Sequence, residues 1–528
     1  MRMLRHHHIS FRSSVGSSGA PQAVFFFLLL PCCLALDFRA PPLISNTSFL
    51  WAWNAPVERC VNKRFQLPPD LRLFSVKGSP QKSATGQFIT LFYADRLGYY
   101  PHIDEKTGNT VHGGIPQLGN LKNHLEKAKT DIAYYIPNDS VGLAVIDWEN
   151  WRPTWARNWK PKDVYKDESV ELVLQKNPQL SFPEASKIAK EDFETAGKSF
   201  MQETLKLGKL LRPNHLWGYY LFPDCYNHNY NHPTYSGNCS DLEKRRNDNL
   251  NWLWKESTAL FPSVYLNIKL KSTPKAAFFV RNRVQEAIRL SKIVNVESPL
   301  PVFVYARPVF TDGSSTYLSQ VSKSSKGVKL SNYLNTTLNP YIINVTLAAK
   351  MCSQVLCHDE GVCTRKHWNS SDYLHLNPVN SAIQTGKGGK YTVSGKVTLE
   401  DLQMFSDKFY CSCYANIHCK KRADIKNVHG VNVCMAEDIC IEGPMKLQPN
   451  DHASSENEAS TTTFSSISPS TTTATVSPCT PKKQSPECLK ARCLEATSNA
   501  TQVGCQSVKQ ENTSHQSRIQ NLKNQTTY

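Results

Sequence analysis

The sequence predicts an α/β barrel of parallel strands followed by a small disulfide-rich module. Between about residues 50 and 312, short apolar runs alternate with amphipathic helical stretches, a pattern typical of parallel βα units. Six such runs over this length suit a closed α/β barrel, which takes roughly 250 residues. An open doubly wound sheet is the alternative, and the absence of a dinucleotide fingerprint or Walker loop disfavours it.

The predicted strands are short runs of apolar and aromatic residues. In chain order they are Leu50–Trp53, Ile89–Tyr93, Val141–Ile146, Leu216–Leu221, Val264–Ile268 and Val302–Tyr305. Helices are predicted from about Asp192 to Leu211 and from about Phe279 to Ile293, because apolar side chains recur on one face of each.

The predicted module lies between Cys352 and Cys440, where eight of the seventeen cysteines fall. Modules this small and this rich in cysteine are held by disulfides rather than by a large core. A zinc site is the alternative, but the Cys411-x-Cys413 spacing disfavours it, so no metal and no cofactor is expected. Beyond about residue 445, Ser/Thr-rich runs predict a largely disordered tail.

A secretory signal is predicted over residues 1–35, where arginines precede an apolar run too short to span a bilayer. Asn-x-Ser/Thr acceptor sites occur at Asn46, Asn138, Asn238, Asn335, Asn344, Asn369, Asn499, Asn512 and Asn524. Together with the clustered cysteines they indicate an oxidising, secretory route. We expect no transmembrane helix.

The net charge of +17 lies mostly between residues 37 and 440. A globular body this basic favours a polyanionic partner such as nucleic acid, anionic lipid or an acidic glycan. Because secretion keeps the chain away from nucleic acid, an extracellular acidic glycan is the expected partner and nucleic acid is excluded.

The strongest chemical signal is the carboxylate pair Asp147 and Glu149, at the end of the run Val141–Ile146. Residues i and i+2 of a strand point to one face, about 6.6 Å apart along it. In a barrel, carboxylates at the carboxyl end of a strand lie at the catalytic face. One member of such a pair can stay protonated while the other is ionised, as glycoside hydrolysis requires. An exposed Asp-x-Glu that opens a loop is the alternative.

Aromatic and basic residues follow this pair closely. They are Trp148, Trp151, Trp155 and Trp159, with Arg152, Arg157 and Lys160 between them. Aromatic faces beside cations suit a sugar polymer that carries carboxylates, whereas packing in the core is the alternative for the tryptophans. Tyr220 and Tyr265 lie at the ends of two other predicted strands and would, taken alone, be core residues.

Three long stretches, Val141–Trp155, Trp217–Asn227 and Val280–Ala287, resemble motifs of the animal hyaluronidases. Ser353–Cys357 and Asn369–Pro378 are similar to the sperm-surface members of that family. The resemblance runs from about residue 38 to residue 440 apart from one gap. It implies a distorted TIM-like (β/α) barrel over residues 36–345, an EGF-like module over 346–440 and a tail over 441–528.

The resemblance implies an endo-β-N-acetylglucosaminidase that cleaves β-1,4 linkages in hyaluronan by substrate-assisted retention, an exception to the scheme with two catalytic carboxylates. Glu149 would be the general acid and base, and Asp147 would orient the substrate's acetamido group. Tyr220 and Tyr265 would hold that group. The positions that match substrate-binding residues are Tyr93, Arg283, Trp148 and Asp224.

The resemblance also implies disulfides and a biological setting. The expected pairs are Cys225–Cys239, Cys352–Cys363, Cys357–Cys411, Cys413–Cys419 and Cys434–Cys440. The setting would be the sperm surface, the acrosome or the extracellular space, with the egg matrix and zona surface as contacts and chondroitin sulfate as a second substrate. The end of the chain is polar, so no GPI signal is expected.

The sequence departs from the family after Asp312. Family members continue with a further strand, whose Trp lines the acetamido pocket, and a helix, whose Cys pairs at the position of Cys60. Residues 313–329 contain no apolar run, Trp or Cys, and are too few for a βα unit of about 30 residues. We therefore expect a barrel that lacks its last strand. A hyaluronan-binding or sperm–egg adhesion protein with little activity is the alternative function.

The effect of this missing segment can be tested by inserting the family's segment after Asp312. An unclosed barrel exposes strand edges, and a lost disulfide costs about 2 to 5 kcal/mol. The chain as printed should therefore be secreted less, carry a free thiol at Cys60 and have lower specific activity than the restored form. Yield, thiol titration and activity of both forms from the same secreting cells provide the measurement, and equal values would contradict the expectation.

Overall fold

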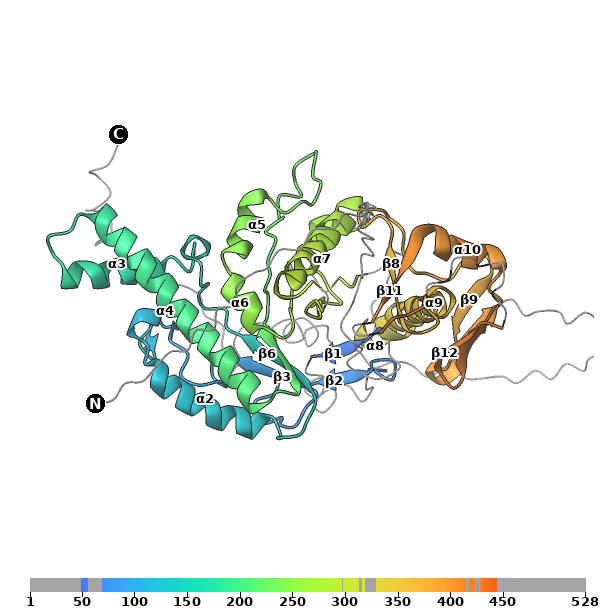
Figure 1. The fold of residues 1–528 in the computed structure, drawn as a ribbon, viewed down its shortest axis with the longest axis horizontal. Helices are drawn as coiled ribbons and strands as arrows, with labels where there is room; N and C mark the ends of the chain where they lie inside the picture. The colour runs from blue at the N-terminus through green and yellow to red at the C-terminus, as the bar shows by residue number, and fades with distance from the viewer. Residues whose placement is uncertain are drawn as a thin grey trace, which may run out of the picture. The chain divides into compact units, whose positions relative to one another are not determined.

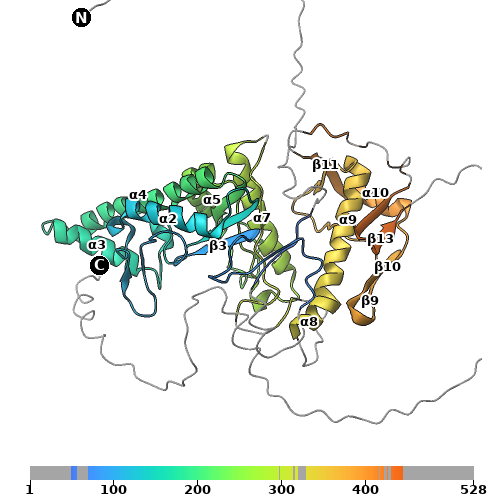
Figure 2. The same cartoon turned by 90° about the horizontal axis from the view of Figure 1, so that it is seen from below.

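The computed structural model describes residues 49–55, 69–296, 298–312, 316–318, 329–414, 417–420, 422, 425, 428 and 430–443. The predicted signal, Cys60, most of residues 313–329 and the tail beyond Gly443 lie outside this part of the chain. Figures 1 and 2 show the described elements from two directions.

A parallel sheet of three strands carries the predicted catalytic residues. β6 (Gly142–Asp147) is the middle strand, with β3 (Ile89–Tyr93) on one side and β7 (His215–Tyr219) on the other. The register sets Tyr93 opposite Asp147. Every residue of β6 before Asp147 is buried, as expected for a strand covered on both faces.

Further parallel pairs continue this arrangement. Beyond β7, bridges join Tyr220 to Phe261, Leu260 to Val302 and Ser263 to Tyr305. Near the start of the chain, β1 (Ala52–Asn54) pairs in parallel with β2 (Val76–Gly78). The side-chain amide of Asn54 donates a hydrogen bond to the hydroxyl of Tyr305 over 3.2 Å. Closure of these strands into a barrel stays a prediction.

The predicted strand at Val264–Ile268 is wrong. The bridges at this point lie at residues 260–263, and Ile268–Leu270 form a short 3-10 helix. The strand starts earlier because Ala259, Leu260 and Phe261 are the fully buried apolar residues of this region. Tyr265 therefore lies just beyond the bridged residues.

Six α-helices accompany the strands in the described residues before 296. They are α2 (Leu121–Tyr135), α3 (Val164–Lys176), α4 (Phe182–Leu211), α5 (Asp241–Asp248), α6 (Asn251–Glu256) and α7 (Pro274–Val294). The predicted start of a helix at Asp192 is wrong, because α4 begins with a capping box in which Ser181 and Glu184 bond reciprocally. That Ser-x-x-Glu signal was present in the sequence.

Helix α4 packs against α2, α3 and the sheet (Figure 1). Trp217 of β7 is fully buried and stacks on Phe92 of β3, with ring centroids 5.7 Å apart. Gly208 of α4 lies against the same indole: a Cβ added there would be 2.7 Å from the ring. The close contact between helix and sheet therefore requires glycine at this position.

The C-terminal part of the described chain combines one long helix with short strand pairs. Its elements are α8 (Lys329–Tyr333), α9 (Asn339–Cys357), β8 (Gly361–Arg365), β9 (Ser381–Thr385), β10 (Tyr391–Gly395), α10 (Leu399–Lys408), β11 (Phe409–Cys413), β12 (Asn432–Ala436) and β13 (Ile439–Glu442). The predicted boundary between residues 345 and 346 falls inside α9. One core cluster joins α9, the strand pairs and Trp53, Leu73 and Phe74 from the start of the chain. The EGF-like character of this region stays a prediction.

Five disulfides join the same cysteine pairs that the resemblance implies: Cys225–Cys239, Cys352–Cys363, Cys357–Cys411, Cys413–Cys419 and Cys434–Cys440. The Sγ atoms of Cys411, Cys413 and Cys419 lie within 4.8 Å of one another. Because each is oxidised, none offers the thiolate that a metal would need.

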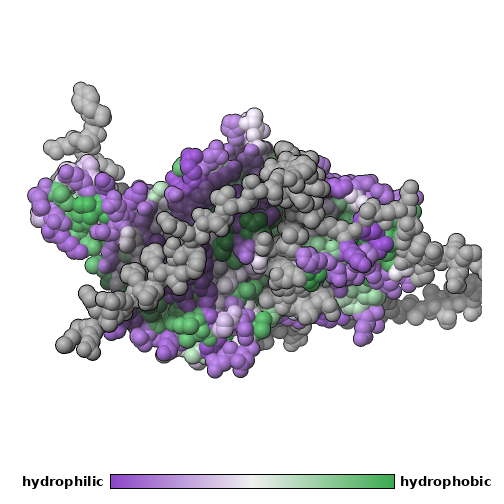
Figure 3. Space-filling model, in the orientation of Figure 1, coloured by the Kyte–Doolittle hydropathy of each residue, from purple (hydrophilic) through white to green (hydrophobic). Residues whose placement is uncertain are grey.

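The surface in view is mostly hydrophilic, with hydrophobic side chains gathered over the end of the α3–α4 pair (Figure 3). Phe182, at the start of α4, is 68% exposed. Within the described residues, none of the helices has the length and apolar character needed to cross a membrane.

Two alanine substitutions in α4 test the contact between helix and sheet. Gly208→Ala should lower the free energy of unfolding, because a forced overlap with Trp217 costs about 1 to 3 kcal/mol and outweighs the helical gain of alanine. Gly197→Ala is the matched control, since its Cβ would lie 3.2 Å from the edge of Trp151 and it gains helix propensity of about 1 kcal/mol. Denaturant unfolding of both variants gives the comparison, and a Gly208→Ala chain as stable as the control would contradict it.

Candidate active site

Asp147 is the last residue of β6, and its carboxyl group lies out of water. Its Oδ1 is buried and has no hydrogen-bond partner among the described residues. Burial raises the pKa of Asp147 well above its ordinary value, and the negative charge of Glu149 raises it further, although Arg152 and Arg96 oppose this. The protonated form of Asp147 therefore persists to higher pH than that of an exposed aspartate.

Glu149 lies two residues beyond, in a loop, and has a different environment. Its side chain is 37% exposed, and its Oε1 is 3.4 Å from Nη2 of Arg152. Arg152 also donates through Nη1 to the backbone carbonyl of Glu149 over 2.9 Å. One carboxyl is thus buried while its neighbour is partly exposed to solvent.

Tyrosine side chains surround the buried carboxyl. The ring centroid of Tyr220 lies 6.3 Å from that of Tyr265 and 5.1 Å from that of Tyr305. Burial raises the pKa values of these three and of Tyr93, and the charge of Asp147 raises each further. The site therefore presents protonated phenols, which are hydrogen-bond donors, close to Asp147.

Sequence reasoning missed Tyr305 and the arginine beside it. Tyr305 ends the predicted strand Val302–Tyr305, so the rule that singled out Tyr220 would also have found it. Arg307 lies over the ring of Tyr265, with its guanidinium carbon 4.4 Å from the centroid. Nothing in the sequence pattern marks Arg307.

Trp148 points away from the carboxyl pair because successive side chains of an extended segment alternate. Its ring is buried and stacks on Tyr100 with centroids 4.5 Å apart. Trp151 is buried as well, whereas Trp159 is exposed. Trp148 and Trp151 therefore pack in the core, which is the alternative interpretation of these tryptophans. The buried position of Trp148 does not support its predicted contact with substrate.

Arg283 and Asp224 form a buried ion pair, with Nη2 and Oδ1 2.7 Å apart. Arg283 also donates to the carbonyl oxygen of Ser263 and to Oδ1 of Asn227. Burial alone would raise the pKa of Asp224, but Arg283 and two backbone N–H groups outweigh it and lower the pKa. Both predicted substrate-binding residues are thus engaged within the protein.

Tyr93 lies nearer the carboxyl pair. The guanidinium carbon of Arg96 lies over its ring, 4.6 Å from the centroid.

Comparison with known proteins places these residues in a family. The family model described as hyaluronidase matches residues 38–322 and 316–424. Hyaluronidase PH-20 of Homo sapiens is 60% identical over 84% of this chain and 92% of its own length. Hyaluronidase-5 of Mus musculus is 56% identical over 92% of this chain and 96% of its own, and hyaluronidase-4 of Homo sapiens is 40% identical over 77% and 90%.

Among solved structures, bee venom hyaluronidase in complex with a hyaluronic acid tetramer is similar to this chain at 31% identity. The alignment covers 51% of this chain and 83% of that one, with a TM-score of 0.45. On the strength of the family model and the relatives, this chain belongs to the hyaluronidase family and is an enzyme, a glycoside hydrolase.

Proposed function

We propose that this enzyme hydrolyses β-1,4 linkages in hyaluronan as an endo-β-N-acetylglucosaminidase, by substrate-assisted catalysis with retention. The observation that carries the proposal is the contrast between Asp147, buried with an unused oxygen, and Glu149, which is half-exposed two residues away. Glycosidases that use a neighbouring group of the substrate need one carboxyl to orient that group and another to transfer protons.

Asp147 supplies the orienting carboxyl. Its unpaired Oδ1 can accept a hydrogen bond from the N–H of the acetamido group, which turns the acetamido carbonyl oxygen toward the anomeric carbon. Burial and the negative charge of Glu149 raise the pKa of Asp147 more than Arg152 and Arg96 lower it, so the carboxylate form gains from a further positive charge. The positive oxazolinium ion that forms when the carbonyl oxygen bonds to the anomeric carbon provides one. Asp147 therefore interacts more strongly with the transition state than with the substrate.

Glu149 acts as the general acid and then as the general base. Its partial exposure, 37% of the side chain, supports a role in proton transfer to the glycosidic oxygen of a polymer lying over the strand ends. It gives a proton to this oxygen as the bond to the anomeric carbon breaks, and then takes one from the water that opens the oxazolinium ion. Attack by the acetamido oxygen and then by water inverts the anomeric carbon twice, so the configuration is retained. Tyr220 and Tyr265 hold the acetamido group.

Hyaluronan, an acidic polymer, suits the basic body of the chain, and chondroitin sulfate would present similar chemistry. The resemblance to sperm-surface hyaluronidases supports a role in passage through the hyaluronan-rich matrix of the egg. In that setting the chain would be secreted or held at the sperm surface.

Binding of hyaluronan with little turnover, as in an adhesion protein, is the second candidate. One observation favours it: Arg307 lies over Tyr265, one of the two tyrosines proposed to hold the acetamido group. Release of reducing ends from hyaluronan by the purified chain distinguishes the two functions, because an adhesion protein would bind the polymer without shortening it.

Glu149→Gln should abolish hydrolysis and leave binding of the polymer intact. General acid–base catalysis contributes about 10² to 10⁴ in rate, so we expect at least a 100-fold loss of reducing-end release. Glu168→Gln, on the exposed side of α3, is the matched control and should keep full activity. Activity within a few-fold of the unaltered chain in the Glu149 variant would reject the assignment.

Asp147→Asn should slow hydrolysis and also stabilise the protein at neutral pH. Because the folded-state pKa of Asp147 is raised above the ordinary 3.8, the native state binds more protons than the unfolded state above about that pH. The free energy of unfolding of the unaltered chain therefore falls as pH rises through this window, and asparagine removes the loss.

Thermal midpoints measured from pH 3.5 to 7 provide the test. The advantage of Asp147→Asn should be small at the acidic end and grow toward neutrality. Asp192→Asn, at an exposed position of α4, should show no such growth. A constant difference between Asp147→Asn and the unaltered chain across the range would show that the carboxyl is not held protonated by burial.

A further inference from the structure

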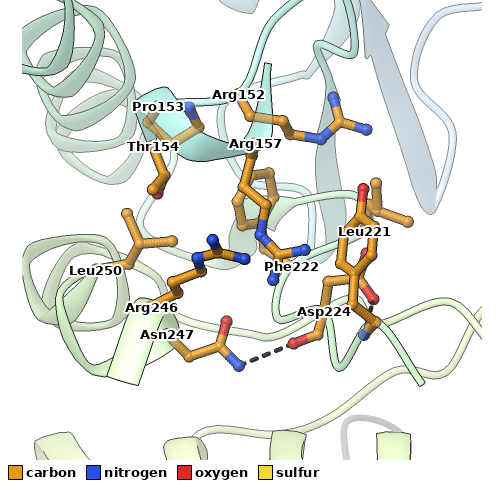
Figure 4. A pocket seen from close by; sticks show the side chains of 11 residues that line it. Arg152, Pro153, Thr154, Arg157, Leu221, Phe222, Asp224, Arg246, Asn247 and Leu250 are labelled. Carbon is orange, nitrogen blue, oxygen red and sulfur yellow. Dashed lines mark hydrogen bonds between the residues drawn. The ribbon is translucent and has the colours of Figure 1, made fainter. Parts of the chain in front are cut away.

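A small pocket lies beside the loop that carries Glu149 (Figure 4). Its volume is about 30 Å³, and its polar lining is formed chiefly by Arg152, Arg157, Asp224, Tyr226, Arg246 and Asn247. Arg152 lines the pocket and also lies 3.4 Å from the carboxyl of Glu149. The tyrosines around Asp147 do not line it. The pocket is therefore separate from the proposed acetamido site and is linked to the proposed proton donor through Arg152.

Positive charge exceeds negative charge around this pocket. Arg157 and Arg246 share one carboxylate, Glu243: Arg157 forms an ion pair with it, and Nη1 of Arg246 donates to its Oε1 over 2.7 Å. Figure 4 shows the two guanidinium groups extending toward one another in the middle of the view. Their shared partner can neutralise only one of them.

The other carboxylates near the pocket are already paired. Asp224 is bound by Arg283 and accepts the backbone N–H groups of Cys225 and Tyr226. Glu149 lies with Arg152. Four arginines thus face three carboxylates, and one positive charge is left without a counterion among these residues.

Arg157 has an unused donor in this place. Its side chain is 8% exposed, its guanidinium lies 3.7 Å from the centroid of the Tyr226 ring, and its Nη1 has no hydrogen-bond partner within the described residues. Burial lowers the pKa of Arg157 to about 10, so it remains cationic at neutral pH. A buried charged donor without an acceptor is costly, and an anionic ligand in the pocket would remove that cost.

We propose that this pocket binds the carboxylate of a glucuronate residue adjoining the cleaved linkage, with Arg157 and Arg246 as its ligands. The inference rests on the proposed function, because hyaluronan alternates N-acetylglucosamine with glucuronate and so places a carboxylate next to every susceptible bond. The planar fork of arginine matches the two oxygens of a carboxylate, and the pocket has room for one small group of this kind.

Binding there would set the register of the polymer. A glucuronate held beside Arg152 positions the neighbouring glycosidic oxygen relative to Glu149, so that only the linkage of the acetamido sugar reaches the proton donor. The same contact would disfavour neutral polymers of N-acetylglucosamine, which leave the arginines without a partner.

The test compares two neighbouring arginines of α5. Arg246→Gln removes a pocket ligand that is only partly buried, at 24% exposure, so the fold should tolerate it. Arg245→Gln removes the same charge from the same helix at an exposed position outside the pocket lining. Each variant is combined with Glu149→Gln, so that ligands are bound without being cleaved. Thermal midpoints of the two double variants should agree.

Dissociation constants are measured for hyaluronan oligosaccharides and for the same oligosaccharides with their carboxyl groups reduced to alcohols. Loss of a hydrogen-bonded ion pair should weaken hyaluronan binding about 10-fold in the Arg246 variant and leave binding of the reduced ligand unchanged. Arg245→Gln should change both constants by less than about two-fold. Arg246→Lys, which keeps the charge but not the fork, should lie between the two.

Two results would overturn the inference. Equal weakening of both ligands by Arg246→Gln, or no weakening of either, would show that the pocket does not recognise the carboxylate, while reducing-end release by the unaltered chain would still uphold the proposed function. Failure of the unaltered chain to bind or shorten hyaluronan would overturn both.

Discussion

The removal of one carboxyl group from water, at the end of β6, is the constraint on which the site depends. Asp147 can be buried because β6 has a parallel neighbour on each side, helices packed on one face and residues of other strands packed on the other, so its last residue emerges among aromatic rings rather than into solvent. An unpaired carboxylate is costly there, and within the described part of the chain its Oδ1 has no hydrogen-bond partner.

Two carboxyl groups with different surroundings lie close together at the end of β6. Glu149 has left the sheet, and Arg152 holds it through both its backbone carbonyl and its carboxyl group. Arg152 also lines the neighbouring pocket, where the arginines outnumber their carboxylate partners. Burial of the Asp147 carboxyl raises its pKa, which costs stability at neutral pH, and Arg152 links the loop of Glu149 to the neighbouring pocket.

The sequence predicts well what depends on local pattern. The bounds of β3 were found as Ile89–Tyr93, and Asp147 and Glu149 were singled out because an apolar run ending in carboxylates is visible without any contact information. Cysteine pairs followed from the resemblance alone. The helix α4 could have been placed correctly, since the capping box at Ser181 is a local signal that outweighs the weaker periodicity farther along the chain.

Other features depend on residues that are distant in the sequence. Arg157 meets Glu243, Arg283 meets Asp224 and Asn54 meets Tyr305 only after the strands have been brought together. An arginine that will be buried in an ion pair looks the same in a sequence as one that binds substrate, so the resemblance that matches Arg283 to a substrate-binding position cannot reveal its ion pair with Asp224. Trp148 shows the reverse case: its neighbours marked it as functional, although strand alternation directs it into the core.

The core of the C-terminal region includes Trp53, Leu73 and Phe74, while Trp51 donates to the hydroxyl of Thr346 over 3.1 Å. During synthesis these early residues leave the ribosome long before α9 and the strand pairs that cover them. At roughly 5 to 20 residues per second, the interval is on the order of tens of seconds. For that time Trp53 and Phe74 can pack on each other but not on α9, so part of their apolar surface stays uncovered. A ribosome that stops before α9 releases a product in which this surface is never covered.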